Sequence, residues 1–319
     1  MWVEMKLQTH IPLSAKEPTI DYQSQLLLMG SCFTENIGTK LSYDQFRNLQ
    51  NPFGVIFNPI SLERLVLRAI REDVFTEKDV FEYGGLWHCF EVHSSLSALT
   101  QEKILGQLNL QLQVLRKSLL EASHLIFTLG TAWVYRHKET DLVVANCHKV
   151  PQLQFSKALL SIESIQNSLR QMVSAIFDGN PKATMIITVS PVRHLKDGFV
   201  GNTQSKAQLI AALHPLVSSR KQVHYFPSYE LLLDELRDYR FYAEDLLHPN
   251  SLAIDYLWEK FQSVWVDPET EPLRKEVDGI QKALCHRPLQ TSSKEFQEFT
   301  TTLQNRIANL KTRMPWANF

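Results

Sequence analysis

The stretch LLLMGSCFTENIG, residues 26–38, places an apolar run directly before a serine and a polar run with helical spacing. A short, continuously apolar run is typical of a buried parallel strand, and residues 34–41 favour a helix. Ser31 would then lie on the turn between them, at the sheet edge where ligands bind in open α/β folds. A serine here is either a ligand-facing residue or a side-chain cap of the helix, and this stretch alone leaves both open.

The rest of the chain continues this alternation of strands and helices. We expect a β-favouring run at 51–59, a hairpin at 80–93 turning at Gly84 and Gly85, strands at 124–130, 142–147, 183–191 and 223–227, and helices at 61–71, 100–122, 158–177, 202–217 and 251–264. Such alternation predicts a parallel sheet covered by helices on both faces.

The C-terminal part has a different pattern. One apolar stripe marks a final helix and consists of Phe296, Phe299, Leu303, Ile307 and Leu310. A stripe of this kind must be covered by the α/β body or by another subunit. We therefore expect an α/β domain over residues 1–267 and a helical extension over 268–319 packed on or against it, in a monomer or homodimer.

Composition narrows the class of protein. The 319 residues are 44% hydrophobic, and 33 basic against 34 acidic residues give a net charge of -1. This near-neutral charge favours a small neutral substrate over nucleic acid, an anionic membrane or a strongly anionic substrate. Residues 1–20 have no basic flank followed by an apolar stretch, and no run is long enough to span a bilayer, so we expect no leader and a cytoplasmic protein. Four scattered cysteines do not form a disulfide framework, in agreement with a reducing compartment: Cys32, Cys89, Cys147 and Cys285.

A second polar motif stands late in the chain, in YAEDLLHPNSLAIDYLW, residues 242–258. Asp245 and His248 are three residues apart, just before a predicted helix. In a loop of that length the carboxylate can reach Nδ1 of the imidazole while Nε2 faces outward, which is the orientation of a general base. The alternative is an Asp in a turn followed by a surface His. Because parallel strands end at one edge, Ser31 and this pair are expected on the same side of the sheet.

The sequence resembles the GSCFA family, a branch of the SGNH or GDSL-like hydrolases. GSCFTENIG matches the stretch from which the family takes its name, with Thr34 where Ala is frequent. Further blocks follow in the family's order over residues 22–260: NPFGVIFNP, FEVHS, FTLGTAWVY, NCHKVP, TVSPVRH and DLLHPN. The resemblance implies a flavodoxin-like three-layer α/β/α sandwich with Ser31 as nucleophile, His248 as base and Asp245 as its orienting carboxylate.

The resemblance also implies a serine esterase that works through an acyl-enzyme and needs no cofactor. The expected oxyanion donors are the amides of Ser31 and Gly54. A third donor in the superfamily is the Asn of a Gly-x-Asn-Asp block, which here reads Gly-Thr-Ala-Trp at 130–133. Thr131 and Asn146 are candidate replacements. A nucleotide or flavin site has no support, because neither G-x-G-x-x-G nor a P-loop sequence is present.

The expected substrate is a small acyl ester. Flat aromatic faces beside a catalytic serine suit a sugar ring, although core packing is the alternative for each aromatic. No apolar lid segment is visible that would shelter a fatty acyl chain, so we expect an acetyl ester of a carbohydrate or similar alcohol. The candidate pocket residues are Trp87, His93, Trp133, Tyr135 and His148, the two histidines being alternatively buried structural residues.

Three other interpretations of the same residues are weaker. A zinc-like metal site has poor spacing and no C-x-x-C pair, and its candidate ligands are His88, Cys89, His93, Cys147 and His148. The thiol of Cys32 is a possible nucleophile, but a free cysteine is usually a small buried hydrophobe. A non-catalytic binding module with the same fold is compatible with the missing Asn.

Overall fold

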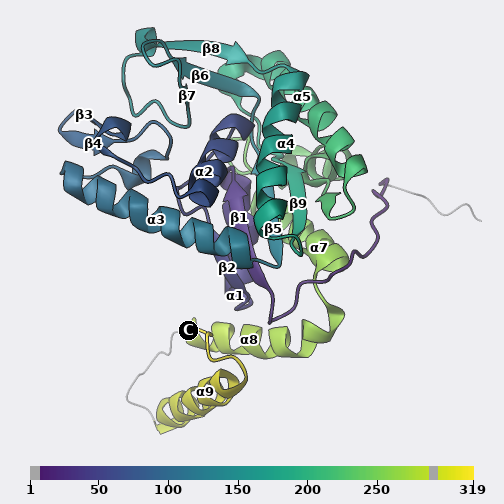
Figure 1. The fold of residues 1–319 in the computed structure, drawn as a ribbon. Coiled ribbons are helices and arrows are strands. Elements are labelled where there is room, and N and C mark those ends of the chain that lie inside the picture. Colours follow the sequence, from purple (N-terminus) through teal and green to yellow (C-terminus); the bar gives the residue numbers. More distant parts are fainter. Residues whose placement is uncertain (1–7, 287–293) are drawn as a thin grey trace, which may run out of the picture.

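The computed structural model describes residues 8–286 and 294–319. The first seven residues, on which the expectation of no leader partly rests, lie outside the described residues. The central sheet has five parallel strands in the order β10-β9-β5-β1-β2 (Figure 1). Their bounds are β1 Gln25–Gly30, β2 Arg47–Gln50, β5 His124–Leu129, β9 Thr184–Val189 and β10 Val223–Tyr225.

Helices cover both faces of this sheet, and the side chains of its strands alternate between them. Leu27 and Met29 of β1 pack in a core with α2 (Pro59–Arg71), α3 (Gln101–Glu121), α4 (Ile162–Gly179) and α5 (Gly198–Ser219). Leu26 and Leu28 face the other way, toward α1 (Cys32–Tyr43) and α7 (Ser251–Trp265). In Figure 1, α2, α3 and α4 pass in front of the strands. The predicted three-layer α/β/α fold is confirmed.

Two strand predictions are wrong in detail. Residues 51–59 form no strand, because Pro52 and Pro59 have no amide hydrogen to donate to a neighbouring strand and Gly54 has φ +71°. The strand that pairs with β1 is β2, which ends just before them. The 142–147 run contributes only β7 (Val143–Val144).

This short strand belongs to a second, antiparallel sheet in the order β7-β6-β8, with β6 Trp133–His137 and β8 Phe155–Leu159. No crossover helix separates β6 from β7, so the two strands pair as antiparallel neighbours. The predicted hairpin is present as β3 (Phe81–Tyr83) and β4 (Leu86–His88).

The remaining elements are short. A three-residue helix α6 (Ser228–Glu230) runs into a π-helix, η5 (Leu231–Leu236). The 3₁₀ turns are η1 Glu77–Asp79, η2 Ser94–Leu96, η3 Gln152–Gln154, η4 Leu195–Asp197, η6 Tyr239–Phe241 and η7 Pro268–Thr270.

The C-terminal segment forms α8 (Glu271–Leu284) and α9 (Lys294–Arg313), which lie beyond the β2 and α1 end of the body (Figure 1). Leu303 and Leu310 of the apolar stripe are buried in one cluster with residues of α1, α7 and α8, whereas Phe299 is 36% exposed. The tail is fastened to the body, because Trp316 Nε1 donates to the Gln45 carbonyl at 3.0 Å and Arg47 lies 3.7 Å over the Trp316 ring. The extension and the body therefore share one core.

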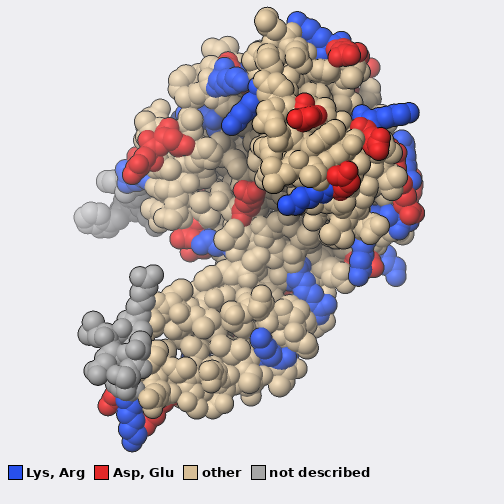
Figure 2. Space-filling model, turned by 90° about the vertical axis from the view of Figure 1, so that its left-hand side faces the viewer, with Lys and Arg blue, Asp and Glu red and all other residues tan. Residues whose placement is uncertain are grey.

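Acidic and basic side chains are interspersed on the face shown in Figure 2 and form no large field of one sign. Among the described residues, no helix is long and apolar enough to cross a membrane.

Candidate active site

Ser31 lies at the carboxyl end of β1, directly before α1. The turn requires glycine at the preceding position, since Gly30 has φ +140° and a Cβ there would lie 2.2 Å from the Thr128 carbonyl oxygen. The Ser31 side chain makes no capping hydrogen bond to α1. Its Oγ is buried and has no hydrogen-bond partner among the described residues. Ser31 is thus the N-cap residue of α1 by position, but the side-chain cap of the alternative interpretation is absent.

Asp245 and His248 form a close pair in the loop before α7. Oδ2 of Asp245 lies 2.6 Å from His248 Nδ1, and Oδ1 accepts the amides of Leu247 at 2.9 Å and His248 at 3.0 Å. Hydrogen bonds from the His248 amide and imidazole and from the Leu247 amide lower the pKa of Asp245 to about 2. The carboxylate thus holds the imidazole through Nδ1 and leaves Nε2 for another group.

The backbone of this loop is tied in place on both sides. Ala243 donates to the His248 carbonyl at 2.7 Å, and Tyr242 forms a β-bridge with Pro249. Asn250 caps α7 through its side chain. The side chains of His248 and Asp245 remain 49% and 46% exposed, so the pair faces solvent on a fixed loop.

No hydrogen bond joins Ser31 Oγ to His248 Nε2 in this structure. The charges of Lys206, Asp197 and His248 all influence the imidazole of His194. Burial is the main cause that lowers the pKa of His194 to about 4, so this ring is neutral at pH 7. Its Nε2 is buried without a partner among the described residues.

The predicted oxyanion donors are engaged in other hydrogen bonds. The Ser31 amide donates to the Thr128 carbonyl at 3.0 Å, and the Gly54 amide donates to the Asn51 carbonyl at 2.7 Å. Thr131 Oγ1 lies 3.0 Å from Ser205 Oγ, and Oδ1 of Asn146 accepts the His148 amide at 2.8 Å. The two backbone amides are therefore not free donors in this conformation, whereas the bond of Asn146 uses its acceptor oxygen and not its Nδ2 donor.

Asn51, which directly follows β2, is a donor that sequence reasoning missed. Its Oδ1 accepts the Gly30 amide at 2.9 Å, so the carboxamide is oriented by the residue before Ser31. Oxygen and nitrogen of one carboxamide are about 2.3 Å apart, which places Nδ2 within roughly 5 Å of the Gly30 nitrogen. Nδ2 is buried and has no partner among residues 8–286 and 294–319. The NPFG block contained this signal, since Asn is the first residue of it.

Lys206 of α5 is the second residue that the sequence did not reveal. It is 1% exposed, and its Nζ donates to the carbonyls of Gly130 at 2.6 Å and Ser190 at 2.7 Å. These carbonyls follow β5 and β9, so Lys206 ties two strand ends together beneath the site. Burial lowers the pKa of Lys206 to about 7. No pattern in the sequence distinguishes this lysine from an exposed helical one.

The predicted aromatic platform is partly occupied by lysine side chains. Trp133 donates through Nε1 to the Gly201 carbonyl at 3.0 Å, and Lys157 Nζ lies 4.7 Å from its ring centroid. Tyr135 lies near both Lys157 and Lys196, at 5.8 and 5.2 Å. Trp87 is half-buried in β4.

The two predicted pocket histidines differ. His93 is half-buried and its Nδ1 lies 3.0 Å from Ser95 Oγ. His148 is 4% exposed with Nε2 2.7 Å from the Cys89 carbonyl oxygen, and burial lowers its pKa to about 4. His148 is therefore buried, as the alternative interpretation of a structural histidine expects.

The two alternative interpretations of these residues are a cysteine nucleophile and a metal site. Burial raises the pKa of the Cys32 thiol, which disfavours the thiolate that a cysteine nucleophile needs. Within the described residues, no three His, Cys, Asp or Glu side chains are grouped so as to hold a metal ion.

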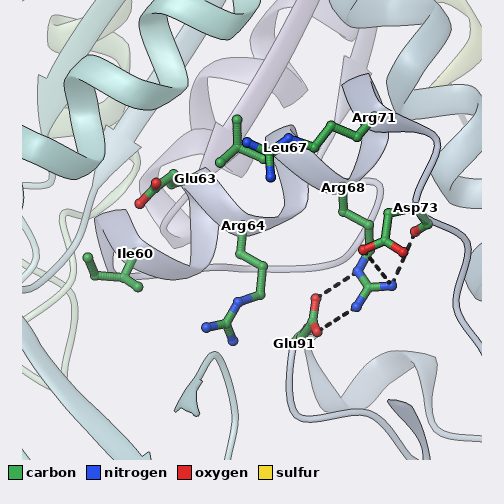
Figure 3. A pocket seen from close by; sticks show the side chains of 8 residues that line it. All are labelled: Ile60, Glu63, Arg64, Leu67, Arg68, Arg71, Asp73 and Glu91. Carbon is green, nitrogen blue, oxygen red and sulfur yellow. Dashed lines mark hydrogen bonds and ion pairs between the residues drawn. The ribbon is translucent and has the colours of Figure 1, made fainter. Parts of the chain in front are cut away.

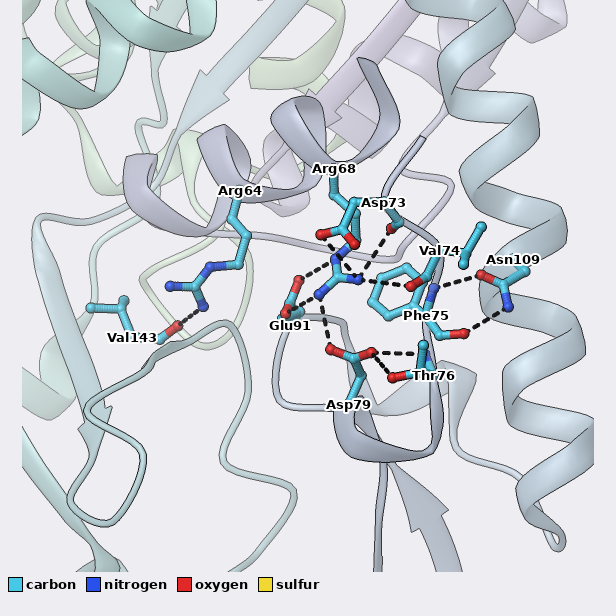
Figure 4. A network of polar contacts seen from close by, with 10 residues as sticks. All are labelled: Arg64, Arg68, Asp73, Val74, Phe75, Thr76, Asp79, Glu91, Asn109 and Val143. Atoms are coloured by element: carbon cyan, nitrogen blue, oxygen red, sulfur yellow. Dashed lines mark hydrogen bonds and ion pairs between the residues drawn. The ribbon is translucent and has the colours of Figure 1, made fainter. Parts of the chain in front are cut away.

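A separate pocket of about 320 Å³ lies between α2 and the loop containing Glu91 (Figure 3). Its wall is a network centred on Arg68, which binds Glu91 through Nε at 3.1 Å and Nη2 at 2.9 Å (Figure 4). The same guanidinium reaches Asp79 Oδ1 at 2.9 Å and the carbonyls of Asp73 and Val74. All donors of Arg68 are satisfied, so this network fastens α2 to the neighbouring loops.

Fold and site together define an α/β/α protein with a buried serine and an Asp–His pair at the carboxyl side of one parallel sheet. The family profile described as GSCFA family matches residues 25–261. A second profile, described as GSCFA domain protein, C-terminal domain, matches residues 277–319. The chain belongs to the GSCFA family. A search among curated proteins finds no match.

Proposed function

We propose that this protein is a serine esterase that hydrolyses small acyl esters, with Ser31 as nucleophile, His248 as general base and Asp245 as orienting carboxylate. The observation that carries the proposal is the Ser31 hydroxyl, which is buried without a partner and does not cap the helix it precedes. A buried hydroxyl left unpaired costs about 1–3 kcal/mol, so its retention calls for a role beyond folding.

In the proposed reaction, Ser31 Oγ attacks the ester carbonyl carbon while His248 Nε2 takes the hydroxyl proton. The imidazolium then gives this proton to the departing alcohol, which leaves an acyl-enzyme on Ser31. Water, deprotonated by the same imidazole, releases the acid and restores the serine. Asp245, held to Nδ1 at 2.6 Å, stabilises the imidazolium. Because Ser31 is fully buried, the groups that cover it must move for substrate to enter.

Asn51 is the proposed side-chain donor to the tetrahedral oxyanion. Its Nδ2 is unpaired and buried on a side chain that the Gly30 amide orients, whereas the amides of Ser31 and Gly54 donate to carbonyls. Preorganised donors of this kind stabilise the charge that develops in the transition state. Asn51 would thus replace the Asn that the Gly-Thr-Ala-Trp block lacks.

The proposed substrate is a short acyl ester, in the first place an acetyl ester of a carbohydrate or similar alcohol. We further propose a cytoplasmic location, supported by four unpaired cysteines.

A second candidate function is a non-catalytic binding module. Two observations favour it: Ser31 is fully buried, and no hydrogen bond joins it to His248. Under this alternative the unpaired groups at the strand ends bind a ligand without turning it over.

One screen separates the two candidates. Purified protein is assayed with aryl acetate, aryl decanoate and acetylated xylose, next to Ser31→Ala and a surface control, Ser263→Ala. The esterase proposal expects hydrolysis of the acetates that Ser31→Ala abolishes and Ser263→Ala retains. A preference for decanoate, or activity on neither acetate, would refute the proposed substrate, and hydrolysis that survives Ser31→Ala would refute the proposed nucleophile.

A further inference from the structure

A small pocket lies beside the Asp245–His248 loop and takes no part in the proposed reaction. Its volume is about 90 Å³, and it is lined by Arg193, Leu233, Arg237, Asp238, Tyr239 and Tyr242. We call it the arginine pocket. Its residues come from three places: the segment after β9, the π-helix η5 with the residue that follows it, and the η6 turn.

The two arginines of this pocket have no anionic partner. Neither guanidinium makes a hydrogen bond or ion pair to a residue that the structure describes, although Arg193 is half-buried and lies 5.7 Å from the Tyr242 ring centroid. The carboxylate of Asp238 is already neutralised, because it binds Arg240 Nη2 at 2.9 Å and accepts the Arg240 amide. The pocket therefore carries two uncompensated positive charges.

A pocket with two unpaired arginines favours ligands that carry a carboxylate or a phosphate. Guanidinium groups present a planar fork of donors that matches carboxylate and phosphate oxygens. Arg193 is half-buried and Arg237 is exposed, and the unused donors of both guanidinium groups are available to a ligand. The other walls are two tyrosines and one leucine, so nothing in the pocket repels an anion apart from the paired Asp238.

The arginine pocket is next to the catalytic loop. Tyr242, which forms one wall, is bridged to Pro249, and the residue after it donates to the His248 carbonyl. Arg193 directly precedes His194, whose imidazole is influenced by His248. A molecule with its ester at His248 and Ser31 therefore has this pocket as a neighbouring subsite.

We propose that the arginine pocket binds an anionic oxygen group, a carboxylate or a phosphate, on the substrate of this enzyme. The inference rests on the proposed esterase function and deepens it, because the substrate becomes an ester of a charged molecule. The near-zero net charge of the whole chain does not oppose this, since the two arginines act locally.

The test compares esters that differ only in charge. The substrates are 4-acetoxybenzoate, its neutral methyl ester, and 4-acetoxyphenyl phosphate. The variants are Arg193→Gln and Arg237→Gln, with Arg220→Gln as control because that arginine is exposed and does not line the pocket. Losing a hydrogen bond to a charged group weakens binding by about tenfold or more, so KM for the charged acetates should rise by that factor in both variants. The kcat values, and KM for the methyl ester, should stay unchanged in both variants. The wild-type protein should have a lower KM for the charged ester whose anionic group the pocket prefers, which is either the carboxylate or the phosphate.

A rise in KM that is equal for the charged and neutral esters, or none at all, would overturn the proposal while leaving a Ser31-dependent esterase intact. If the wild-type protein hydrolyses none of the three esters, the esterase proposal fails instead. Binding is then measured by calorimetry with benzoate and inorganic phosphate on the wild-type protein. Binding that Arg193→Gln removes would keep the anion site, and no binding of either probe would overturn it.

Discussion

Oδ1 of Asn51 accepts a hydrogen bond at 2.9 Å from the amide of Gly30, the residue before Ser31, and Nδ2 of the same side chain is buried and unpaired. The Gly30 amide is a donor, so the atom that faces it must be the oxygen, and the nitrogen is the atom left over. Asn51 also has φ +38°, a left-handed conformation that asparagine tolerates better than most residues.

Asn51→Asp tests the role of Nδ2 as an oxyanion donor. Aspartate keeps an acceptor for the Gly30 amide and tolerates the same backbone, but it cannot donate. We expect kcat for aryl acetate to fall by about 10²–10³, with KM little changed. Asn48→Asp on β2 is the matched control. A kcat within about threefold of wild type, in a protein that unfolds at the wild-type temperature, would remove Asn51 from the mechanism.

Ser31→Ala and His248→Ala should act as one unit. Each alone should lose most of kcat, and the double variant should be no slower than the slower single variant, because the base has no task without the nucleophile. Steady-state rates of the three variants and wild type provide the test. Multiplicative losses would mean that the two side chains act independently.

His148 should make the fold sensitive to mild acid. Its pKa is lowered to about 4 in the folded protein, against about 6.5 in the unfolded chain. Between these values the unfolded chain binds more protons, so the free energy of unfolding decreases as pH falls from about 6.5 to 4. One such group contributes at most about 1.4 kcal/mol per pH unit. Urea titrations at pH 7, 5.5 and 4.5 should show a smaller loss in His148→Gln, and His194 adds a loss in the same direction. Equal losses in both proteins would contradict this.

The Arg68 network should matter for stability and little for chemistry. The side chains of Arg68 and Glu91 are 10% and 8% exposed, and removing one partner of a buried pair typically costs about 3–5 kcal/mol. Glu91→Ala should therefore lower the free energy of unfolding by several kcal/mol, while the exposed Glu121→Ala, which breaks a 4.0 Å pair with Lys117, should change it by less than about 1 kcal/mol. Denaturation in urea measures both. A Glu91→Ala protein as stable as the control would show that the network is not structural.

Much of the fold could be predicted, because it depends on local patterns. Apolar runs such as 124–130 and 183–191 indicated buried strands, and period-3.6 stripes indicated the helices between them. The second sheet was missed because β6 and β8 are half-exposed strands whose pairing is decided by tertiary contacts. The apolar run around β7 was predicted as a strand of the parallel sheet because it lies between predicted strands and helices that alternate along the chain.

The part of the candidate site whose residues are close together in the sequence could be predicted. Asp245 and His248 are three residues apart, so a local loop could bring them together, and their contact is only 2.6 Å. Lys206 and Asn51 reach the site through long-range packing, and their contacts with Gly130 and Gly30 do not follow from spacing along the chain. The oxyanion donors could not be assigned for the same reason, since the hydrogen bonds of Ser31 and Gly54 depend on Thr128 and Asn51.

The central claim is that Ser31 is an activated nucleophile, and covalent labelling tests it most directly. The wild-type protein is treated with an aryl fluorophosphonate, and the modified peptide is located by mass spectrometry, with Ser31→Ala, His248→Ala and the control Ser42→Ala treated alike. We expect one adduct per chain on Ser31 in the wild type and Ser42→Ala, none in Ser31→Ala, and much slower labelling in His248→Ala. An unlabelled Ser31 in wild-type protein that hydrolyses aryl acetate, or an adduct on another residue such as Cys32, would contradict the account.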